Sequence, residues 1–174
     1  NGNSDTCTTA VLVQDITPPT AVCTNLNLSL DSNGLAVITP LDIDNGSSDN
    51  CGVSNLQIDT DTLDCSTLGV NTVFLTVSDP SGNVDSCLSS VNIIDNSPPV
   101  AGCTDVTVYL DNTGNLTVTG NDVAPNSSDN CGFTFSLIGG TFDCNDIGSN
   151  QVFVTVTDPG NLTASCASNV TVAD

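Results

Sequence analysis

The stretch "GVNTVFLTVSDPSGNVDSC" at residues 69–87 contains the pattern that decides the fold. Its first half is rich in β-branched residues, alternates apolar with polar positions towards its end and shows no helical period, which is typical of a β-strand. The phrase Asp-Pro-Ser-Gly-Asn follows at 79–83, and its Gly and Asn readily adopt the positive φ angles of a tight turn. The stretch therefore predicts two successive strands joined by a hairpin.

This pattern occurs twice in the chain. "GSNQVFVTVTDPGNLTASC" at residues 148–166 repeats it, and the phrase "SSDNCG" stands at both 47–52 and 127–132. Four cysteines also recur at a spacing of about 80 residues, as the pairs Cys23/Cys103, Cys51/Cys131, Cys65/Cys144 and Cys87/Cys166. Because repetition at a fixed period defines the architecture, we expect two tandem units, at residues 16–95 and 96–174.

Each unit contains further short runs that indicate strands, such as "LNLSLD" at 26–31 and "VTVYLD" at 106–111. Roughly six or seven short strands in about 80 residues are typical of a small immunoglobulin-like β-sandwich. A unit of this size is near the lower limit for a self-sufficient core, so disulfides are expected to contribute. The predicted fold is all-β, a tandem of disulfide-stapled immunoglobulin-like sandwiches.

Residues 1–15, "NGNSDTCTTAVLVQD", match "SGNVDSCLSSVNIID" at 81–95, the closing strand of the first unit. Both complete units already own a closing strand, so this segment is predicted to be the closing strand of a preceding unit. Its expected partner lies outside residues 16–174, either as a covalent upstream unit or as a neighbouring subunit that accepts a donated strand. Cys7 then requires a partner equivalent to Cys23, which favours the covalent version.

The composition excludes several classes of function. The chain has no Lys, Arg, His, Glu, Met or Trp, and its 20 Asp residues give a net charge of −20. Nucleic-acid binding, a basic membrane-binding patch and a P-loop all need basic residues, and the common Ser and Cys nucleophile systems need His. Paired carboxylates could hydrolyse glycosides, but a sugar cleft favours aromatic platforms and the chain has five Phe and one Tyr. We predict that the protein is not an enzyme.

Nine cysteines in 174 residues favour an oxidising, extracellular location. Metal-binding thiols in a cytosolic protein would favour CxxC spacing, which the sequence lacks. No stretch approaches the roughly 20 apolar residues of a membrane span, so no membrane insertion is expected.

Three elements together resemble a known family: "PPTAVC" at 18–23, "SDNCG" at 48–52 and "VFLTVSDPSGNVDSC" at 73–87. They are similar to the hyalin-repeat (HYR or HYR-like) module, and the resemblance covers the whole chain. It implies immunoglobulin-like domains strung in tandem in secreted and cell-surface proteins, including surface adhesins of gliding Bacteroidota. It also implies adhesion or extracellular scaffolding and no catalysis. The chain departs from the family in lacking basic residues and in having few aromatic ones.

Four cysteines in each unit permit three pairings. In immunoglobulin-like sandwiches the first strand can run parallel to the last, which would bring together the cysteines near the starts of those strands. The remaining two would close a loop of about 14 residues, worth roughly 3 kcal/mol in the chain-entropy model. The expected bonds are Cys23–Cys87, Cys51–Cys65, Cys103–Cys166 and Cys131–Cys144.

Twenty Asp residues without an internal cation repel one another unless counter-ions help. Ca²⁺ prefers hard oxygen ligands, and here Asp stands among Asn, Gly and Ser, so we predict structural Ca²⁺ at the poles of the units. The predicted ligands are Asp15, Asp42, Asp49 and Asp79 in the first unit and Asp95, Asp122, Asp129 and Asp158 in the second. The alternatives are a solvated acidic surface and separate Asp caps on separate turns.

These observations predict a structural segment of an extracellular filament or surface adhesin, assembled head to tail with other copies or repeats. The Pro pairs in "TPP" at 17–19 and "SPP" at 97–99 would act as stiff spacers between units. The alternative is a glycan- or protein-binding adhesion module. Its recognition loops would be sought where the units differ, at 53–64 and 133–143.

Overall fold

The computed structural model describes residues 1–174 and consists mainly of strands and loops. The first half contains β1 (Leu26–Ser29), β2 (Leu35–Val37), α1 (Pro40–Ile43), β3 (Asn55–Ile58), β4 (Thr62–Asp64), η1 (Cys65–Thr67), β5 (Gly69–Ser78) and β6 (Val84–Ile94). The second half contains β7 (Val106–Tyr109), β8 (Asn115–Thr117), α2 (Gly120–Val123), β9 (Thr134–Ile138), β10 (Thr141–Asp143), η2 (Cys144–Asp146), β11 (Gly148–Thr157) and β12 (Thr163–Ala173). Each element of the first half thus has a counterpart in the second.

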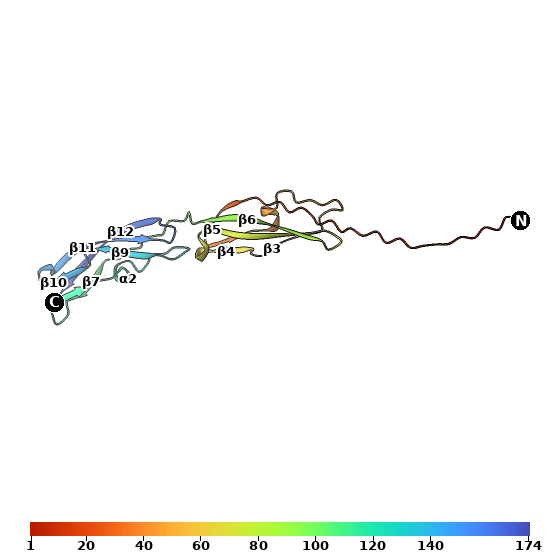
Figure 1. The fold of residues 1–174 in the computed structure, drawn as a ribbon. Coiled ribbons are helices and arrows are strands. Elements are labelled where there is room, and N and C mark those ends of the chain that lie inside the picture. Colours follow the sequence, from red (N-terminus) through yellow and green to blue (C-terminus); the bar gives the residue numbers. More distant parts are fainter. The chain divides into compact units, whose positions relative to one another are not determined.

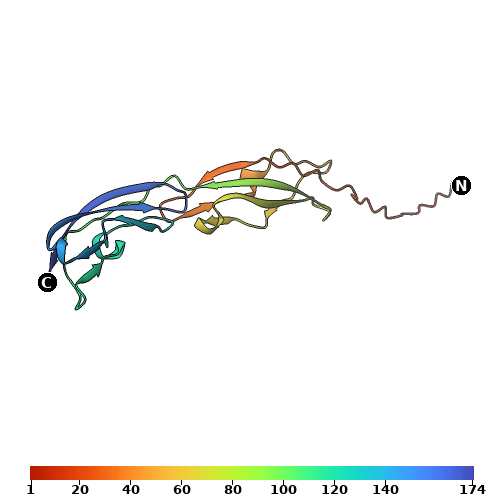
Figure 2. The ribbon, with the colours of Figure 1, turned by 60° about the vertical axis from the view of Figure 1, so that its left-hand side comes forward.

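Four strands of the second half form one sheet in the order β7-β12-β11-β9, and β8 pairs separately with β10. Strand β11 runs antiparallel to both β12 and β9, whereas β12 runs parallel to β7. The long strands β11 and β12 lie side by side (Figures 1 and 2). The first strand of this sheet is therefore parallel to the last, as the sequence predicts.

The strands of the first half have the same order, β1-β6-β5-β3, with a separate β2-β4 pair. Strand β3 runs antiparallel to β5, and β2 runs antiparallel to β4. The predicted fold class, an all-β chain with two sandwich-like, immunoglobulin-like halves, is confirmed.

The long central strand of each half supplies the middle of a core. On β5 the side chains of Val73, Leu75 and Val77 are fully buried. On β11 the corresponding residues are Val152, Val154 and Val156, and they are equally buried. Successive side chains on a strand point to opposite faces, so these alternating residues all lie on one face of their sheet. This is the pattern that residues 69–87 show in the sequence.

In each half an aspartate, Asp79 or Asp158, begins the turn that follows the long central strand. Gly82 in the first half has φ +87°, and Asn161 takes the matching position in the second half with φ +67°. Only Gly and a few small polar residues such as Asn adopt this left-handed conformation readily. The carboxylates of Asp79 and Asp158, just before these residues, accept the backbone N–H groups of Asn83 and Leu162 at 2.8 Å and so close each turn.

Residues 1–19 form no strand, and residues 1–14 run as exposed chain at the N-terminal end (Figure 1). The side chains of Val11, Leu12 and Val13 are between 79% and 89% exposed. The strand conformation predicted for residues 1–15 is therefore not formed in this structure. Burial of the segment would require polypeptide outside residues 16–174 and stays a prediction.

By their tertiary contacts the residues form two compact units. The first unit consists of Asn1–Leu26, Ile38–Asp61 and Thr72–Ser90, and the second consists of Asn27–Val37, Thr62–Asn71 and Val91–Asp174. The second unit thus includes three segments of the first sequence repeat. Domain boundaries at residues 15 and 95 stay a prediction.

The disulfides agree in part with the expected pairing. Cys23 is bonded to Cys87 and Cys103 to Cys166, as expected from parallel first and last strands. The other expected bonds, Cys51–Cys65 and Cys131–Cys144, are not formed, because Cys65 is bonded to Cys131. Cys51 and Cys144 are free, exposed thiols.

The Cys65–Cys131 bond lies within the second unit. It ties the segment Thr62–Asn71, which contains β4 and η1, to the loop that carries the second "SDNCG" phrase. The Asn130 side-chain amide adds a hydrogen bond to the carbonyl of Asp31 at 3.2 Å. The repeated phrase therefore anchors its loop to residues of the preceding repeat, where the sequence predicted a bond inside its own repeat.

We expect the double replacement Cys65→Ser and Cys131→Ser to lower the free energy of unfolding. The bond closes a loop of 66 residues, for which the chain-entropy model gives about 4 kcal/mol. Urea denaturation measures the change. As a control, Cys51→Ser replaces a free, exposed thiol and should change stability by less than about 0.5 kcal/mol. A double variant that unfolds at the same urea concentration as the parent would contradict this role.

Candidate metal centre

Three aspartates of the second unit converge. Asp95 follows β6, Asp129 lies in the loop between α2 and β9, and Asp158 follows β11. Each can offer one carboxylate oxygen such that these oxygens all lie within 4.8 Å of one another. Asp95 and Asp158 are only 5% and 4% exposed, and Asp129 is half-buried. Backbone segments far apart in the sequence thus bring three acidic groups to one point.

One oxygen of each carboxylate is held by the local backbone. Asp95 accepts the N–H of Ser97 at 3.0 Å, Asp129 accepts that of Cys131 at 2.7 Å, and Asp158 accepts that of Leu162 at 2.8 Å. These bonds fix the orientation of each carboxylate. The second oxygen of each group is not used by these bonds.

The second oxygens are Asp95 Oδ2, Asp129 Oδ1 and Asp158 Oδ2, and all three are buried without a hydrogen-bond partner. No Lys, Arg or His side chain exists in the chain to approach them. Two like charges about 4 Å apart repel by roughly 4 kcal/mol at an effective dielectric constant of about 20. A cation bound between the three carboxylates would offset this repulsion and satisfy the oxygens that the local backbone leaves unpaired.

The geometry fits a single Ca²⁺ ion. Calcium takes oxygen ligands at roughly 2.3–2.6 Å, so two ligands of one ion lie at most about 5 Å apart. The three oxygens lie within 4.8 Å of one another, close enough for one ion to contact all of them. Calcium has six to eight ligands in proteins, and water can supply those that the carboxylates do not.

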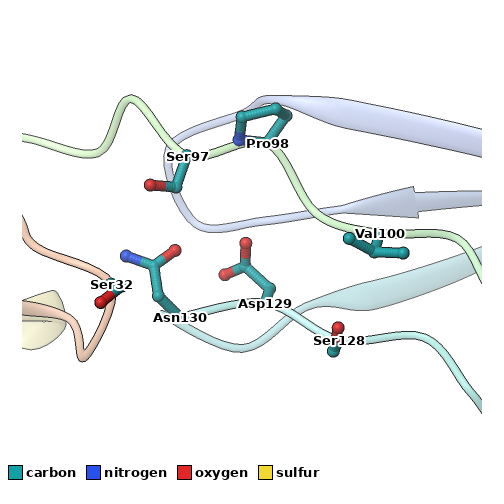
Figure 3. Close-up of a pocket in the computed structure, with 7 residues that line it drawn as sticks. All are labelled: Ser32, Ser97, Pro98, Val100, Ser128, Asp129 and Asn130. Carbon is teal, nitrogen blue, oxygen red and sulfur yellow. The ribbon is translucent and has the colours of Figure 1, made fainter.

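A pocket of about 360 Å³ adjoins the cluster. It is lined by Ser32, Ser97, Pro98, Val100, Ser128, Asp129 and Asn130. Figure 3 shows the carboxylate of Asp129 and the amide oxygen of Asn130 directed into the same space below Ser97 and Pro98. Asn130 Oδ1 is also buried without a hydrogen-bond partner. Asn130 is therefore a fourth candidate oxygen donor beside the three carboxylates.

The first unit has a related but different group, formed by Asp15, Asp49 and Cys51. Asp15 accepts the N–H of Thr17 at 3.0 Å, and Asp49 accepts the N–H of Cys51 at 2.7 Å. Asp15 Oδ2 and Asp49 Oδ1 are buried without a partner. Two carboxylates of this group therefore have the same half-satisfied state as those of the second unit.

Asp79, the counterpart of Asp158, is not left with a free oxygen. Its side chain is 3% exposed, and the Asn83 side chain donates to its Oδ2 at 2.7 Å. The position of Asn83 is taken in the second half by Leu162, which cannot donate from its side chain. The amide of Asn83 thus satisfies in the first unit an oxygen whose equivalent is unpaired in the second.

Hydrogen bonds also shift the pKa values of two side chains in the first unit, Asp15 and Cys51. The backbone N–H of Thr17 is the main cause that lowers the pKa of Asp15 below its ordinary value. A hydrogen bond with Asp15 is the main cause that raises the pKa of Cys51, and the nearby charges of Asp15, Asp49 and Asp79 act in the same direction. Cys51 therefore stays a thiol to higher pH than an isolated cysteine would.

Besides Asp79, two further predicted ligands lie outside both groups. Asp42 and Asp122 sit in the first turns of α1 and α2, where each accepts the N–H and the hydroxyl of Thr39 or Thr119 at 2.6–2.7 Å. The threonine hydroxyl is the main cause that lowers the pKa of each carboxyl. A lowered folded-state pKa means that the bond stabilises the fold above the ordinary Asp pKa and is lost as pH falls through the lowered value. These two residues cap helices.

Sequence reasoning missed Asn130 and Asn83. Asn130 belongs to the repeated phrase, and the repetition of Asp-Asn together was the available signal. The contrast between Asn83 and Leu162 is visible when the two halves are aligned, but its meaning depends on the turn that brings residue 83 back to Asp79.

No family model matches the chain, and no curated protein matches it. Solved structures are similar at low identity. A structure of human protocadherin-24 EC1-2 is 14% identical with a TM-score of 0.40, and the match covers 90% of this chain and 98% of that one. Cadherin domains 1–4 of protocadherin gamma B7 are 16% identical with a TM-score of 0.36, covering 90% and 51%. An endo-fucoidan hydrolase from glycoside hydrolase family 107 is 13% identical with a TM-score of 0.33, covering 90% and 35%.

The chain spans about half the length of the protocadherin gamma B7 chain that it matches. Its own helices are short, and none has the length and apolar character needed to cross a membrane.

We expect calcium to raise the melting temperature of the chain and Asp158→Asn to remove most of this increase. Calcium at about 100 times its dissociation constant adds about 2.7 kcal/mol, which corresponds to about 5–10 °C for a chain of this size. Asp158→Asn removes one buried charge, so the variant should melt higher than the parent in chelator and gain little from calcium.

Thermal melts by circular dichroism, with calcium and with chelator, measure both effects. Asp5→Asn is the matched control, because Asp5 is exposed in the segment before β1 and far in sequence from the cluster. It should respond to calcium as the parent does. Equal melting temperatures of the parent in calcium and in chelator would count against a structural ion.

Proposed function

We propose that this chain is a structural segment of an extracellular fibre or surface adhesin built of tandem repeats, stabilised by calcium between carboxylates. The observation that carries the proposal is the cluster of Asp95, Asp129 and Asp158, whose inward oxygens are buried and unpartnered. Such a cluster costs stability without a cation and adds stability with one.

The position of the cluster supports a mechanical role. Asp95 stands two residues before the "SPP" segment, Asp129 stands two residues before the Cys131 of the disulfide, and Asp158 closes a turn. An ion held by all three would fasten the segment after β6 to the loop before β9 and to the end of β11. The disulfide beside it fastens Thr62–Asn71 to the same loop. A disulfide and an ion site at neighbouring points of the same loop would both resist separation of these segments under tension.

The composition supports an extracellular setting. Three disulfides persist in an oxidising compartment, and extracellular calcium is available at the concentrations that low-affinity sites require. A net charge of −20 also keeps repeats from associating non-specifically. Other copies or repeats of the same protein, arranged head to tail, are the proposed partners, and no catalytic role is proposed.

The alternative, a glycan- or protein-binding module, has less support. The segment at 133–143 contains the aromatic residues that could serve recognition, but Phe133 and Phe135 pack against the core of the second half. Their rings meet edge to face with centroids 5.2 Å apart. They are thus used for packing, and the half-exposed Phe153 on β11 pairs across the sheet with the exposed Ile138 on β9.

A single-molecule pulling experiment tests the mechanical role. The chain, tethered at its two termini, should unfold at higher force in calcium than in chelator. The reason is that an ion that binds only the folded form lowers the free energy of that form. Asp129→Asn should lose most of the difference, whereas Asp5→Asn should keep it. The proposed function would be contradicted if the parent chain unfolded at the same force in calcium and in chelator.

A further inference from the structure

The free cysteines Cys51 and Cys144 occupy the same two repeat positions as the bonded pair Cys131 and Cys65. We propose that Cys144 of one copy forms a disulfide with Cys51 of a second copy, which joins chains covalently in series. The proposal rests on the proposed function, since it names the chemistry by which copies of an extracellular segment connect.

The surroundings of Cys144 reproduce those of Cys65. Each cysteine begins a short 3-10 helix, η1 or η2, whose N-cap is the preceding aspartate. The thiol sulfur of Cys144 lies 3.8 Å from the carbonyl oxygen of Gly114, and the sulfur of Cys65 lies 3.6 Å from that of Gly34. Both glycines have nearly the same positive φ, +75° and +74°. The cysteine, the 3-10 helix and the glycine that receive Cys131 at Cys65 therefore occur a second time at Cys144, and we call each such set a half-site.

The second half-site has room where the first is filled. At Gly34 a Cβ atom would lie 2.6 Å from the sulfur of Cys65 and 2.8 Å from the carbonyl oxygen of Asn130. At Gly114 a Cβ atom would meet only the sulfur of Cys144, at 2.8 Å. The place that Asn130 takes against Gly34 is thus open against Gly114. A residue equivalent to Asn130 would fill it.

Asn50, next to Cys51, is that equivalent residue. The phrase "SSDNCG" at 47–52 is identical to the one at 127–132. The Cys51 N–H donates to Asp49 at 2.7 Å, as the Cys131 N–H donates to Asp129 at 2.7 Å, so both loops hold their cysteine in the same local conformation. Cys51 is exposed and borders a pocket of about 410 Å³ with Asn50. The loop that docks in the formed junction is therefore presented a second time, with its cysteine unbonded.

Cys7, the third free thiol, is not expected to compete. Its match in the sequence is Cys87, which bonds to Cys23, so Cys7 calls for a partner of the Cys23 type. The pairing rule of the repeats thus assigns Cys51 and Cys144 to each other and leaves Cys7 apart.

The bond forms by exchange with a small disulfide such as glutathione disulfide. The Cys51 thiolate attacks one sulfur of glutathione disulfide, forms a mixed disulfide and releases one glutathione thiolate. The Cys144 thiolate of the other copy then attacks the Cys51 sulfur of the mixed disulfide and releases the second. Two protein thiols lose two protons and two electrons, and one glutathione disulfide is reduced to two glutathiones.

The test uses the full chain with Cys7→Ser, in a glutathione redox buffer that contains calcium. We expect a ladder of covalent oligomers on non-reducing gels, which collapses to monomer after reduction. Chains that also carry Cys51→Ser or Cys144→Ser should each stay monomeric alone. An equal mixture of these two variants should give a dimer and no larger species, because each chain then offers one half of the junction.

Peptide mapping identifies the bond. Cleavage before each aspartate releases Cys51 in residues 49–58 and Cys144 in residues 143–145, and the expected cross-linked species joins these two peptides. Dimers of either variant alone, or a mixture that stays monomeric, would overturn the proposal. If the calcium-dependent melting persists while no ladder forms, the covalent junction is refuted and the calcium-stabilised segment is not.

Discussion

The lack of any basic side chain is the constraint on which this structure depends. Every carboxylate that folding brings out of water must be satisfied by backbone N–H groups, by hydroxyl or amide groups, or by a cation from outside. Most aspartates use the first means, as Asp31 and Asp111 do in their hairpin turns. At Asp95, Asp129 and Asp158 a backbone N–H group satisfies one oxygen of each carboxylate, and the other oxygen has no hydrogen-bond partner. The three remaining oxygens have no partner in the chain, and a cation from outside is the group that we propose for them.

The same loop that carries Asp129 also carries Cys131, and this links the ionic and the covalent features. The Cys131 N–H orients the Asp129 carboxylate, while the Cys131 sulfur is bonded to Cys65. Because the six-residue phrase is repeated, the first repeat presents the same loop with Asp49 and Cys51. One short phrase therefore serves two purposes, as an anchor for a junction and as a source of carboxylate oxygen.

Much of the fold could be predicted from the sequence, because it follows from local patterns. The alternation at Val73, Leu75 and Val77 and the turn after Asp79 fix the central hairpin, and parallel first and last strands imply the Cys23–Cys87 bond. The Cys65–Cys131 bond could not be predicted in this way. A bond inside one repeat closes a shorter loop and was therefore the simpler expectation, and the contact between the two repeats leaves no local pattern in the sequence. The capping role of Asp42 had a signal, a threonine three residues earlier at Thr39, but that signal is also compatible with a ligand.

The proposed calcium site lies between Asp95, Asp129 and Asp158. The most direct measurement is an anomalous difference map from crystals of the chain grown in calcium, collected at a long wavelength. The account predicts a peak bonded to an oxygen of each of the three carboxylates at roughly 2.3–2.6 Å. A map from crystals at saturating calcium that shows no such peak, with the three inward oxygens hydrogen-bonded to water, would contradict it.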